Sequence, residues 1–183
     1  MRLVLLVLAV SLGLGGPALA RGKTLSPELQ PLGFLVGRWT APEGKTEQGT
    51  ASGRSEFTVE AAGGALLRRD HTVLRGADGK RAGSLGQVML IYPEGGGLKA
   101  DYSDGAHVIH YTKAEVQPGR SVTFSTAARE GVPAFRLTYA LAPGDQVAVK
   151  FEMAQPGGGG FRTVAEGEMK RAAAKGRKKK GEG

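Results

Sequence analysis

The stretch FRLTYALAPGDQVAVKFEM, residues 135–153, decides the fold of this chain. Apolar residues occur at every second position on either side of a central turn: Phe135, Leu137, Tyr139 and Leu141, then Val147, Val149, Phe151 and Met153. Alternation with a period of two is typical of a strand that has one face on a core and one in water. Pro143-Gly144-Asp145 between the two runs is typical turn sequence. The stretch predicts an antiparallel β-hairpin.

The same pattern recurs along most of the chain. Residues 55–60 and 98–103 also alternate, and a final strand is predicted from Phe161 to about Lys170. Turn sequences separate these runs: Gly63-Gly64, Ala77-Asp78-Gly79, residues 93–97, Asp104-Gly105, Pro118-Gly119 and the glycines after Pro156. We predict an all-β fold, an antiparallel meander of about nine or ten strands that forms a barrel or a sandwich. A barrel is favoured because it removes unpaired strand edges.

The first twenty residues have the three parts of a secretory signal peptide. Met1-Arg2 is positively charged, residues 3–14 are apolar, and Ala18-Leu19-Ala20 is an A-x-A cleavage site. Glycines and Pro17 interrupt the apolar run before it reaches the ~20 residues of a membrane span. We therefore expect residues 1–20 to be a signal peptide cleaved near Ala20, and the protein to be exported to a periplasm or secreted.

The predicted mature chain divides into an N-terminal arm, a barrel and a tail. The arm is expected at residues 21–30, the barrel domain at 31–171 and a disordered basic tail at 172–183. The chain has no cysteine, which excludes disulfides, thiolate chemistry and attachment through an acylated cysteine. No later stretch is long and apolar enough to be a transmembrane helix.

The positive charge is concentrated at the C-terminus. Of the formal net charge of +8, residues from Lys170 onward contribute seven basic groups against one acid, so the barrel itself is nearly neutral. The tail has no aromatic residue to stack on bases, so specific nucleic-acid binding is not predicted. Weak, salt-sensitive contact with an anionic surface is the interaction that this composition allows.

Residues 34–39, FLVGRW, resemble the Gly-x-Trp start of lipocalin-like (calycin) barrels. The arrangement from Pro31 to the final Met169-Lys170-Arg171 resembles uncharacterised exported bacterial families related to nitrobindin. The resemblance implies that Trp39 closes the bottom of the barrel, and that Arg171 or Arg162 packs across its ring as a cation–π pair. The nitrobindin group binds haem through a histidine near the final strands. Residues 161–171 contain no histidine, so haem is not carried over and the cofactor stays unassigned.

Two candidate ligand contacts share a face of one predicted strand. Arg69 and His71 alternate with Arg68 and Asp70, and their own face also carries Leu67 and Val73. If that face lines the barrel, Arg69 and His71 would anchor an anionic ligand. The alternative is that this face is outside and the face with Leu66 and Leu74 is inside.

The remaining candidates are tyrosines and histidines. Tyr92, Tyr102 and Tyr139 lie on largely apolar faces, where they either line a cavity or belong to the core with one satisfied hydroxyl. His107 and His110 are three residues apart on a predicted strand, so they point to opposite faces and no metal site is predicted.

No catalytic motif stands out, and there is no G-x-S-x-G nucleophile elbow. The leading hypothesis is an exported, non-enzymatic β-barrel that binds a small apolar or amphipathic molecule. One alternative is an enzyme that uses a cavity histidine or tyrosine, in haem-dependent or isomerase-type chemistry. Another is an envelope interaction protein that acts through its basic tail.

Overall fold

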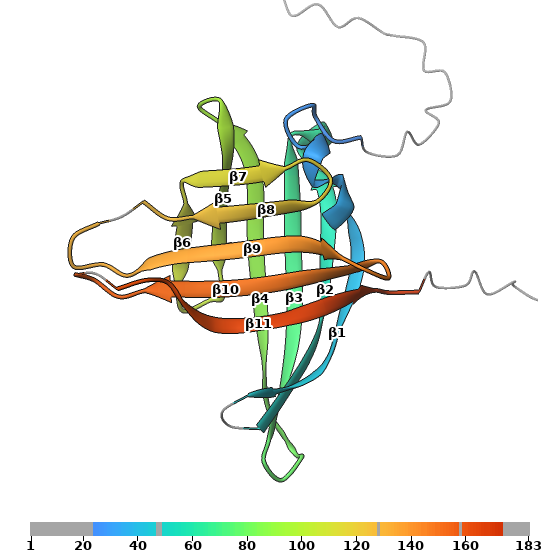
Figure 1. The fold of residues 1–183 in the computed structure, drawn as a ribbon. Helices are drawn as coiled ribbons and strands as arrows, with labels where there is room; N and C mark the ends of the chain where they lie inside the picture. The colour runs from blue at the N-terminus through green and yellow to red at the C-terminus, as the bar shows by residue number, and fades with distance from the viewer. Residues whose placement is uncertain (1–23, 47–48, 128, 158, 174–183) are drawn as a thin grey trace, which may run out of the picture.

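The computed structural model describes residues 24–46, 49–127, 129–157 and 159–173. This part of the chain is an antiparallel β structure of eleven strands with two short 3-10 helices (Figure 1). The elements are η1 (Gln30–Leu35), β1 (Gly37–Thr46), β2 (Gly49–Glu60), η2 (Ala61–Gly63), β3 (Ala65–Gly76), β4 (Arg81–Glu94), β5 (Gly97–Ser103), β6 (Val108–Tyr111), β7 (Lys113–Gln117), β8 (Ser121–Ser125), β9 (Ala134–Ala142), β10 (Gln146–Ala154) and β11 (Arg162–Arg171).

The prediction of an all-β antiparallel meander is confirmed, with slightly more strands than the nine or ten expected. Residues 108–117, which follow the Asp104-Gly105 turn without a further turn signal, form two short strands instead of one. Only Thr112 separates β6 from β7. The break at Thr112 could not have been predicted, because it contains neither the glycine nor the proline that usually marks a turn in a sequence.

All strands belong to one sheet that curls into a nearly closed barrel. Its order is β6-β5-β4-β3-β2-β1-β11-β10-β9-β8-β7, and the two edge strands, β6 and β7, are consecutive in the chain. The pairing of β1 with β11, at Trp39 with Arg171 and Thr40 with Lys170, joins the two halves. In Figure 1, β1 to β6 cross β7 to β11 at a steep angle, so the inner faces of the two halves enclose the core.

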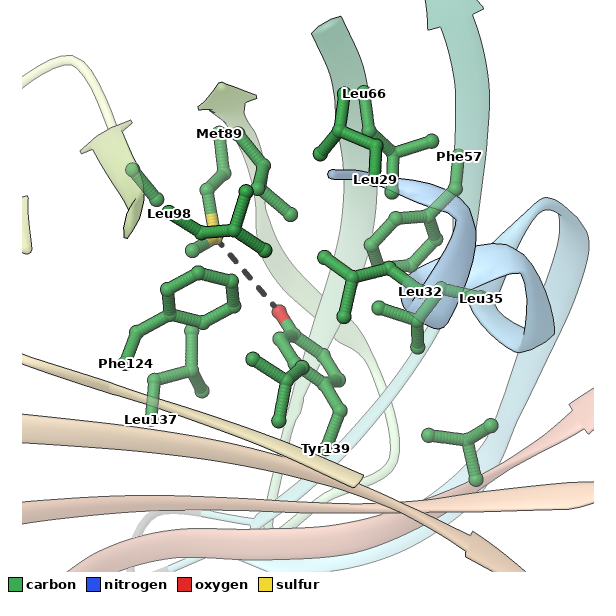
Figure 2. Packing of buried hydrophobic residues seen from close by; sticks show 14 of the residues in the cluster. Leu29, Leu32, Leu35, Phe57, Leu66, Met89, Leu98, Phe124, Leu137 and Tyr139 are labelled. Carbon is green, nitrogen blue, oxygen red and sulfur yellow. Dashed lines mark hydrogen bonds between the residues drawn. The ribbon is translucent and has the colours of Figure 1, made fainter. Parts of the chain in front are cut away.

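The core consists of side chains that alternate inward along the strands. In the hairpin of β9 and β10, Leu137, Tyr139 and Val147 are at most 5% exposed, as their alternation predicts. Phe57 and Leu66 reach the same core from β2 and β3, and the Phe57 ring meets the Tyr139 ring edge to face at 5.7 Å (Figure 2). Each large apolar side chain buried in this way stabilises the fold by about 1.5–3 kcal/mol.

A short helix covers one end of the barrel. Leu32 and Leu35 of η1 are fully buried and face Phe57 and Tyr139 (Figure 2). Pro31 lies in the first turn of η1, where its fixed φ fits and no backbone donor is lost. Backbone hydrogen bonds from Gly119 to Pro31 and from Ser26 to Gly63 connect this segment to the β7–β8 turn and to η2.

Trp39 lies directly after this cap. Its Nε1 donates to the carbonyl of Leu35 at 2.7 Å, and its side chain is fully buried. Of the two arginines that the resemblance suggested as its partner, Arg171 covers the ring, with its guanidinium carbon 4.2 Å from the ring centroid. The predicted signal peptide at residues 1–20 lies outside the described residues, as do all but two residues of the predicted tail.

Candidate functional site

The barrel holds an open cavity of about 560 Å³ between its two halves. This volume falls within the range of about 300–1,000 Å³ that is usual for small-molecule sites. Residues of β3 to β6 line one side of the cavity and residues of β9 to β11 line the other. The cavity therefore lies inside the barrel, enclosed by both halves of the sheet.

One wall of the cavity is apolar because of how β9, β10 and β11 pair. The registers place Leu137, Phe151 and Ala165 in one row across the three strands, and Tyr139, Val149 and Gly167 in the next. In each row β11 contributes the smallest residue, and a methyl group added at Gly167 would meet no atom within 4 Å. The missing side-chain volume on β11 leaves the space that the cavity occupies.

Aromatic and aliphatic side chains cover this wall. The rings of Phe135 and Phe151 stack with centroids 5.8 Å apart, at 9° between their planes. Ile109 of β6 lines the cavity opposite them. All three side chains are only partly buried, although they pack on the core, because they also face the cavity.

The inner end of the cavity is polar. Arg68 and Asp70 are two residues apart on β3, so both point into the barrel, where their side chains are 13% and 9% exposed. Arg68 Nη2 donates to Asp70 Oδ2, and Arg68 Nη1 donates to the Tyr139 hydroxyl. Ser55 Oγ donates to Asp70 Oδ1 at 2.6 Å. A charged pair is thus held, hydrogen-bonded, inside the barrel.

The protonation states at this end follow from its surroundings. Burial by itself would lower the pKa of Arg68, but the neighbouring Tyr139 and Asp70 oxygens outweigh it and the pKa is raised. Burial raises the pKa of Tyr139, and the Arg68 charge reduces that rise without cancelling it. At neutral pH, therefore, Arg68 is a cation and the Tyr139 hydroxyl keeps its proton, which it directs at the Met89 sulfur 3.9 Å away (Figure 2).

Two more tyrosines face the cavity. Gln87 Nε2 donates to the Tyr102 hydroxyl at 2.7 Å, and burial raises the pKa of Tyr102. Tyr111 is 2% exposed, and burial raises its pKa as well. Its ring packs on Phe124, but within the described residues its hydroxyl has no hydrogen-bond partner. Because Tyr111 lines the cavity, water or a ligand there can bond with this hydroxyl.

The outer rim of the cavity carries Asp104, His107, Val108 and Glu166. Asp104 Oδ1 accepts the backbone N–H groups of Ala106 and His107, at 3.0 and 2.7 Å, which lowers the pKa of Asp104. Val108 is 60% exposed. The cavity therefore opens to solvent beside the Asp104-Gly105 turn.

Arg69 and His71, the predicted anionic anchors, do not line this cavity. Leu66 is fully buried on the inward face of β3. The face of β3 that carries Arg69 and His71 is therefore the outer one, which is the alternative that the sequence left open. Arg69 is exposed, and its Nη1 lies 3.4 Å from Thr58 Oγ1 on the outer surface. Arg69 and His71 border a second groove, of about 600 Å³, across β1 to β3, together with Arg38, Arg54 and Glu56. The inward-facing Trp39, Ser55 and Asp70 also line it.

The predicted tyrosines occupy three different positions. Tyr102 lines the cavity, and Tyr139 lies in the core with its hydroxyl bonded to Arg68. Tyr92 points outward and donates to Asp101 Oδ2 at 2.9 Å, while His110 Nδ1 lies 2.6 Å from Asp101 Oδ1. The structure thus brings only Tyr102, of the five predicted ligand contacts, to the wall of the cavity.

Neither His107, at the rim, nor His110, on the outer face, belongs to a cluster of metal-ligating residues. Within the described ranges, His, Asp and Glu nowhere gather in a group of three or more that could hold a metal ion. In the same part of the chain, no helix has the length and apolar character needed to cross a membrane.

Arg68, Asp70 and Tyr111 were missed by the sequence analysis. Arg68 and Asp70 were assigned to the opposite face of their strand from the candidates, because both faces of β3 mix polar and apolar residues. Knowledge of the pairing register with β2 would have identified them as inward-facing, since Arg68 lies opposite the buried Phe57 and Asp70 lies opposite Ser55.

Comparison of the chain with family models and with curated proteins gave no match. The nearly closed antiparallel barrel, capped by η1 and followed by Gly37-Arg38-Trp39, is compatible with a lipocalin-like fold.

Proposed function

We propose that this protein binds a small apolar or amphipathic molecule inside its barrel. The observation that supports this most directly is the cavity of about 560 Å³, with aromatic and aliphatic side chains on one wall and Arg68, Gln87 and Tyr102 at its inner end. Each methylene group of a ligand buried there contributes about 0.8 kcal/mol. The polar end would fix the orientation of the ligand.

Export of the protein is part of the same proposal. It rests on Met1-Arg2, the apolar residues 3–14 and the Ala18-Leu19-Ala20 site. N-terminal sequencing of the protein recovered from the cells that make it should give Arg21, or a residue close to it, as the first residue. Full-length protein confined to the cytoplasm would overturn export and leave the cavity proposal unaffected.

A relationship to the nitrobindin-related exported families is proposed on two features, the Gly37-Arg38-Trp39 motif and the arrangement from Pro31 to Arg171. The Trp39–Arg171 contact supports this relationship. It does not bring haem with it, since β11 carries no histidine.

Filling the cavity tests the binding proposal. Gly167→Leu would place a branched side chain where a methyl group meets no atom within 4 Å, and the register directs it inward beside Tyr139 and Val149. Gly86→Leu is the matched control, because Gly86 also has open space but lies opposite His71 on the outer face. Both variants should keep the circular dichroism spectrum of the native protein.

The probe is Nile red, a neutral apolar dye whose fluorescence rises in apolar sites. We expect the native protein and Gly86→Leu to bind it with equal affinity, and Gly167→Leu to bind it about tenfold more weakly, a loss of about 1.4 kcal/mol. The proposal is overturned if the native protein does not bind the dye, or if Gly167→Leu binds it as well as the control does.

A second function, contact with an anionic surface, is favoured by the outer face of β1 to β3. Arg38, Arg54 and Arg69 border the same groove as Ala172, where the chain leaves the barrel toward the basic residues 175–180. Vesicles that contain phosphatidylglycerol should bind the full chain in low salt, and binding should fall as salt rises. Equal binding after deletion of residues 172–183 would exclude the tail.

A further inference from the structure

The polar end of the cavity is rich in hydrogen-bond donors. A guanidinium group has five N–H donors, and the contacts of Arg68 occupy Nη1 and Nη2 while Nε has no partner within the described residues. The Tyr111 hydroxyl makes no hydrogen bond to another described residue. The Tyr102 hydroxyl accepts from Gln87 and still has its own proton to donate. A group that enters this end therefore meets donors and should itself be an acceptor.

The charged side chains around the cavity carry no net positive charge. Arg68 is neutralised by direct contact with Asp70. The acidic side chain at the mouth of the cavity is Asp104, and its pKa is lowered, which keeps it ionised. His107, the remaining titratable base on the rim, lies 3.3 Å from Asp104. A carboxylate that entered the cavity would meet acidic groups and an arginine whose charge is already compensated.

We propose that the cavity selects an amphipathic molecule whose polar group is an uncharged hydrogen-bond acceptor, such as an ester, amide or alcohol, over the carboxylate with the same chain. This inference rests on the proposed binding function. It follows from a donor-rich end in which the cation, Arg68, is paired with Asp70. An uncharged acceptor uses the free donors without adding negative charge beside Asp70.

Matched ligands test the selection. Methyl decanoate and decanoate have the same acyl chain, and only the second is charged at neutral pH. Displacement of Nile red should show that methyl decanoate binds about tenfold more tightly than decanoate. Decanoate that binds as tightly as the ester would overturn the inference while the binding function stands. If neither ligand nor Nile red binds, the binding function itself fails.

Removal of single acidic groups then tests the cause. Asp70→Asn keeps an oxygen to accept from Ser55 and Arg68 but removes the charge that neutralises Arg68. Its affinity for decanoate should rise about tenfold, and its affinity for methyl decanoate should change little. Asp101→Asn is the control, since Asp101 is an acid of the outer face, bonded to Tyr92 and His110.

A second variant keeps the charge explanation testable if Asp70→Asn does not fold. Asp104→Asn retains an oxygen for the backbone N–H groups of Ala106 and His107 and removes a negative charge at the rim. It should raise the affinity for decanoate in the same direction, by a smaller factor. If every folded variant among these leaves the ratio of ester to carboxylate affinity at the native value, the charge explanation is wrong.

Discussion

Arg171 lies over the indole of Trp39, and the same guanidinium group donates hydrogen bonds to three other residues. Its Nη1 and Nη2 donate to the carbonyls of Val36 and Phe34, at 3.1 and 3.4 Å. Its Nε donates to Asp145 Oδ2 at 2.7 Å, in the turn between β9 and β10. One side chain of the last strand thus contacts the first strand, the segment that precedes it and a hairpin turn.

Replacement of this arginine should destabilise the barrel. We expect Arg171→Ala to lower the free energy of unfolding by about 1–3 kcal/mol, because a cation–π contact and several charge-assisted hydrogen bonds are lost together. Arg171→Lys keeps the charge but not the planar fork, so its loss should be intermediate. Urea unfolding measures both. Arg162→Ala, at an exposed position of the same strand, should change stability by less than about 0.5 kcal/mol. Equal effects at residues 162 and 171 would contradict this role.

Glu152 should make stability depend on acidic pH. Its side chain is 7% exposed, and hydrogen bonds from Arg136 and Lys150, at 2.8 and 3.0 Å, lower its pKa. Because the folded state releases this proton more readily than the unfolded chain does, Glu152 stabilises the fold above its unfolded pKa of about 4.3. That contribution is lost as the pH falls through the lower, folded pKa.

Substitution at residue 152 measures that contribution. Glu152→Gln should lose about 1–2 kcal/mol at neutral pH. It should also flatten the fall in stability below about pH 4.3. Chemical unfolding at a series of pH values is the measurement. Glu168→Gln, at an exposed glutamate of β11 without an ion-pair partner within the described residues, is the control. A steep acid dependence that persists in Glu152→Gln would refute the assignment.

The buried tyrosines should make the stability of the fold depend on alkaline pH. Burial raises the pKa of both Tyr111 and Tyr139, so the folded state holds these protons more tightly than the unfolded state does. Their contribution is complete below the unfolded pKa of about 10 and is lost as the pH rises above it. Tyrosinate absorbance should therefore appear at higher pH in native protein than in urea. Tyr111→Phe and Tyr139→Phe should each shrink the late phase, and a late phase of unchanged size in both variants would refute the assignment.

Gly63 should not accept a side chain. Its φ is +102°, and a Cβ there would lie 2.2 Å from the carbonyl oxygen of Thr24. We expect Gly63→Ala to destabilise the fold by about 1–3 kcal/mol, because the backbone is strained and the N-terminal segment is displaced from η2. Gly97→Ala is the control, since that glycine lacks a positive φ and has open space around it. Thermal melting compares the two, and equal midpoints would count against the close contact.

The fold could be predicted from sequence because its signals are local. Period-two alternation in β9 and β10 and the turn at residues 143–145 together specify a hairpin, and the structure contains that hairpin. The division of residues 108–117 into β6 and β7 was missed because Thr112 is no turn residue. The cavity could not have been found in this way, because it depends on small residues of β11 lying beside large residues of β9 and β10.

The inward charges illustrate the same limit. On β3, each face carries both polar and apolar residues, so the alternation does not tell which face is inside. Only the pairing with Phe57 and Ser55 of β2 shows that Arg68 and Asp70 point inside. Register is a property of two strands and cannot be read from one. Sequence analysis therefore named Arg69 and His71, one position away from the residues that reach the barrel interior.

The connectivity of the sheet has a consequence for folding kinetics. Every ladder except β1 with β11 joins strands that are consecutive in the chain, and such hairpins form within microseconds. The β1–β11 ladder has to bring together the two ends of the domain, against a loop-closure entropy that grows with the intervening length. We therefore expect barrel closure to be the late event in folding, and the Arg171 contacts to form with it. Loss of the Arg171 side chain should speed unfolding far more than it slows folding.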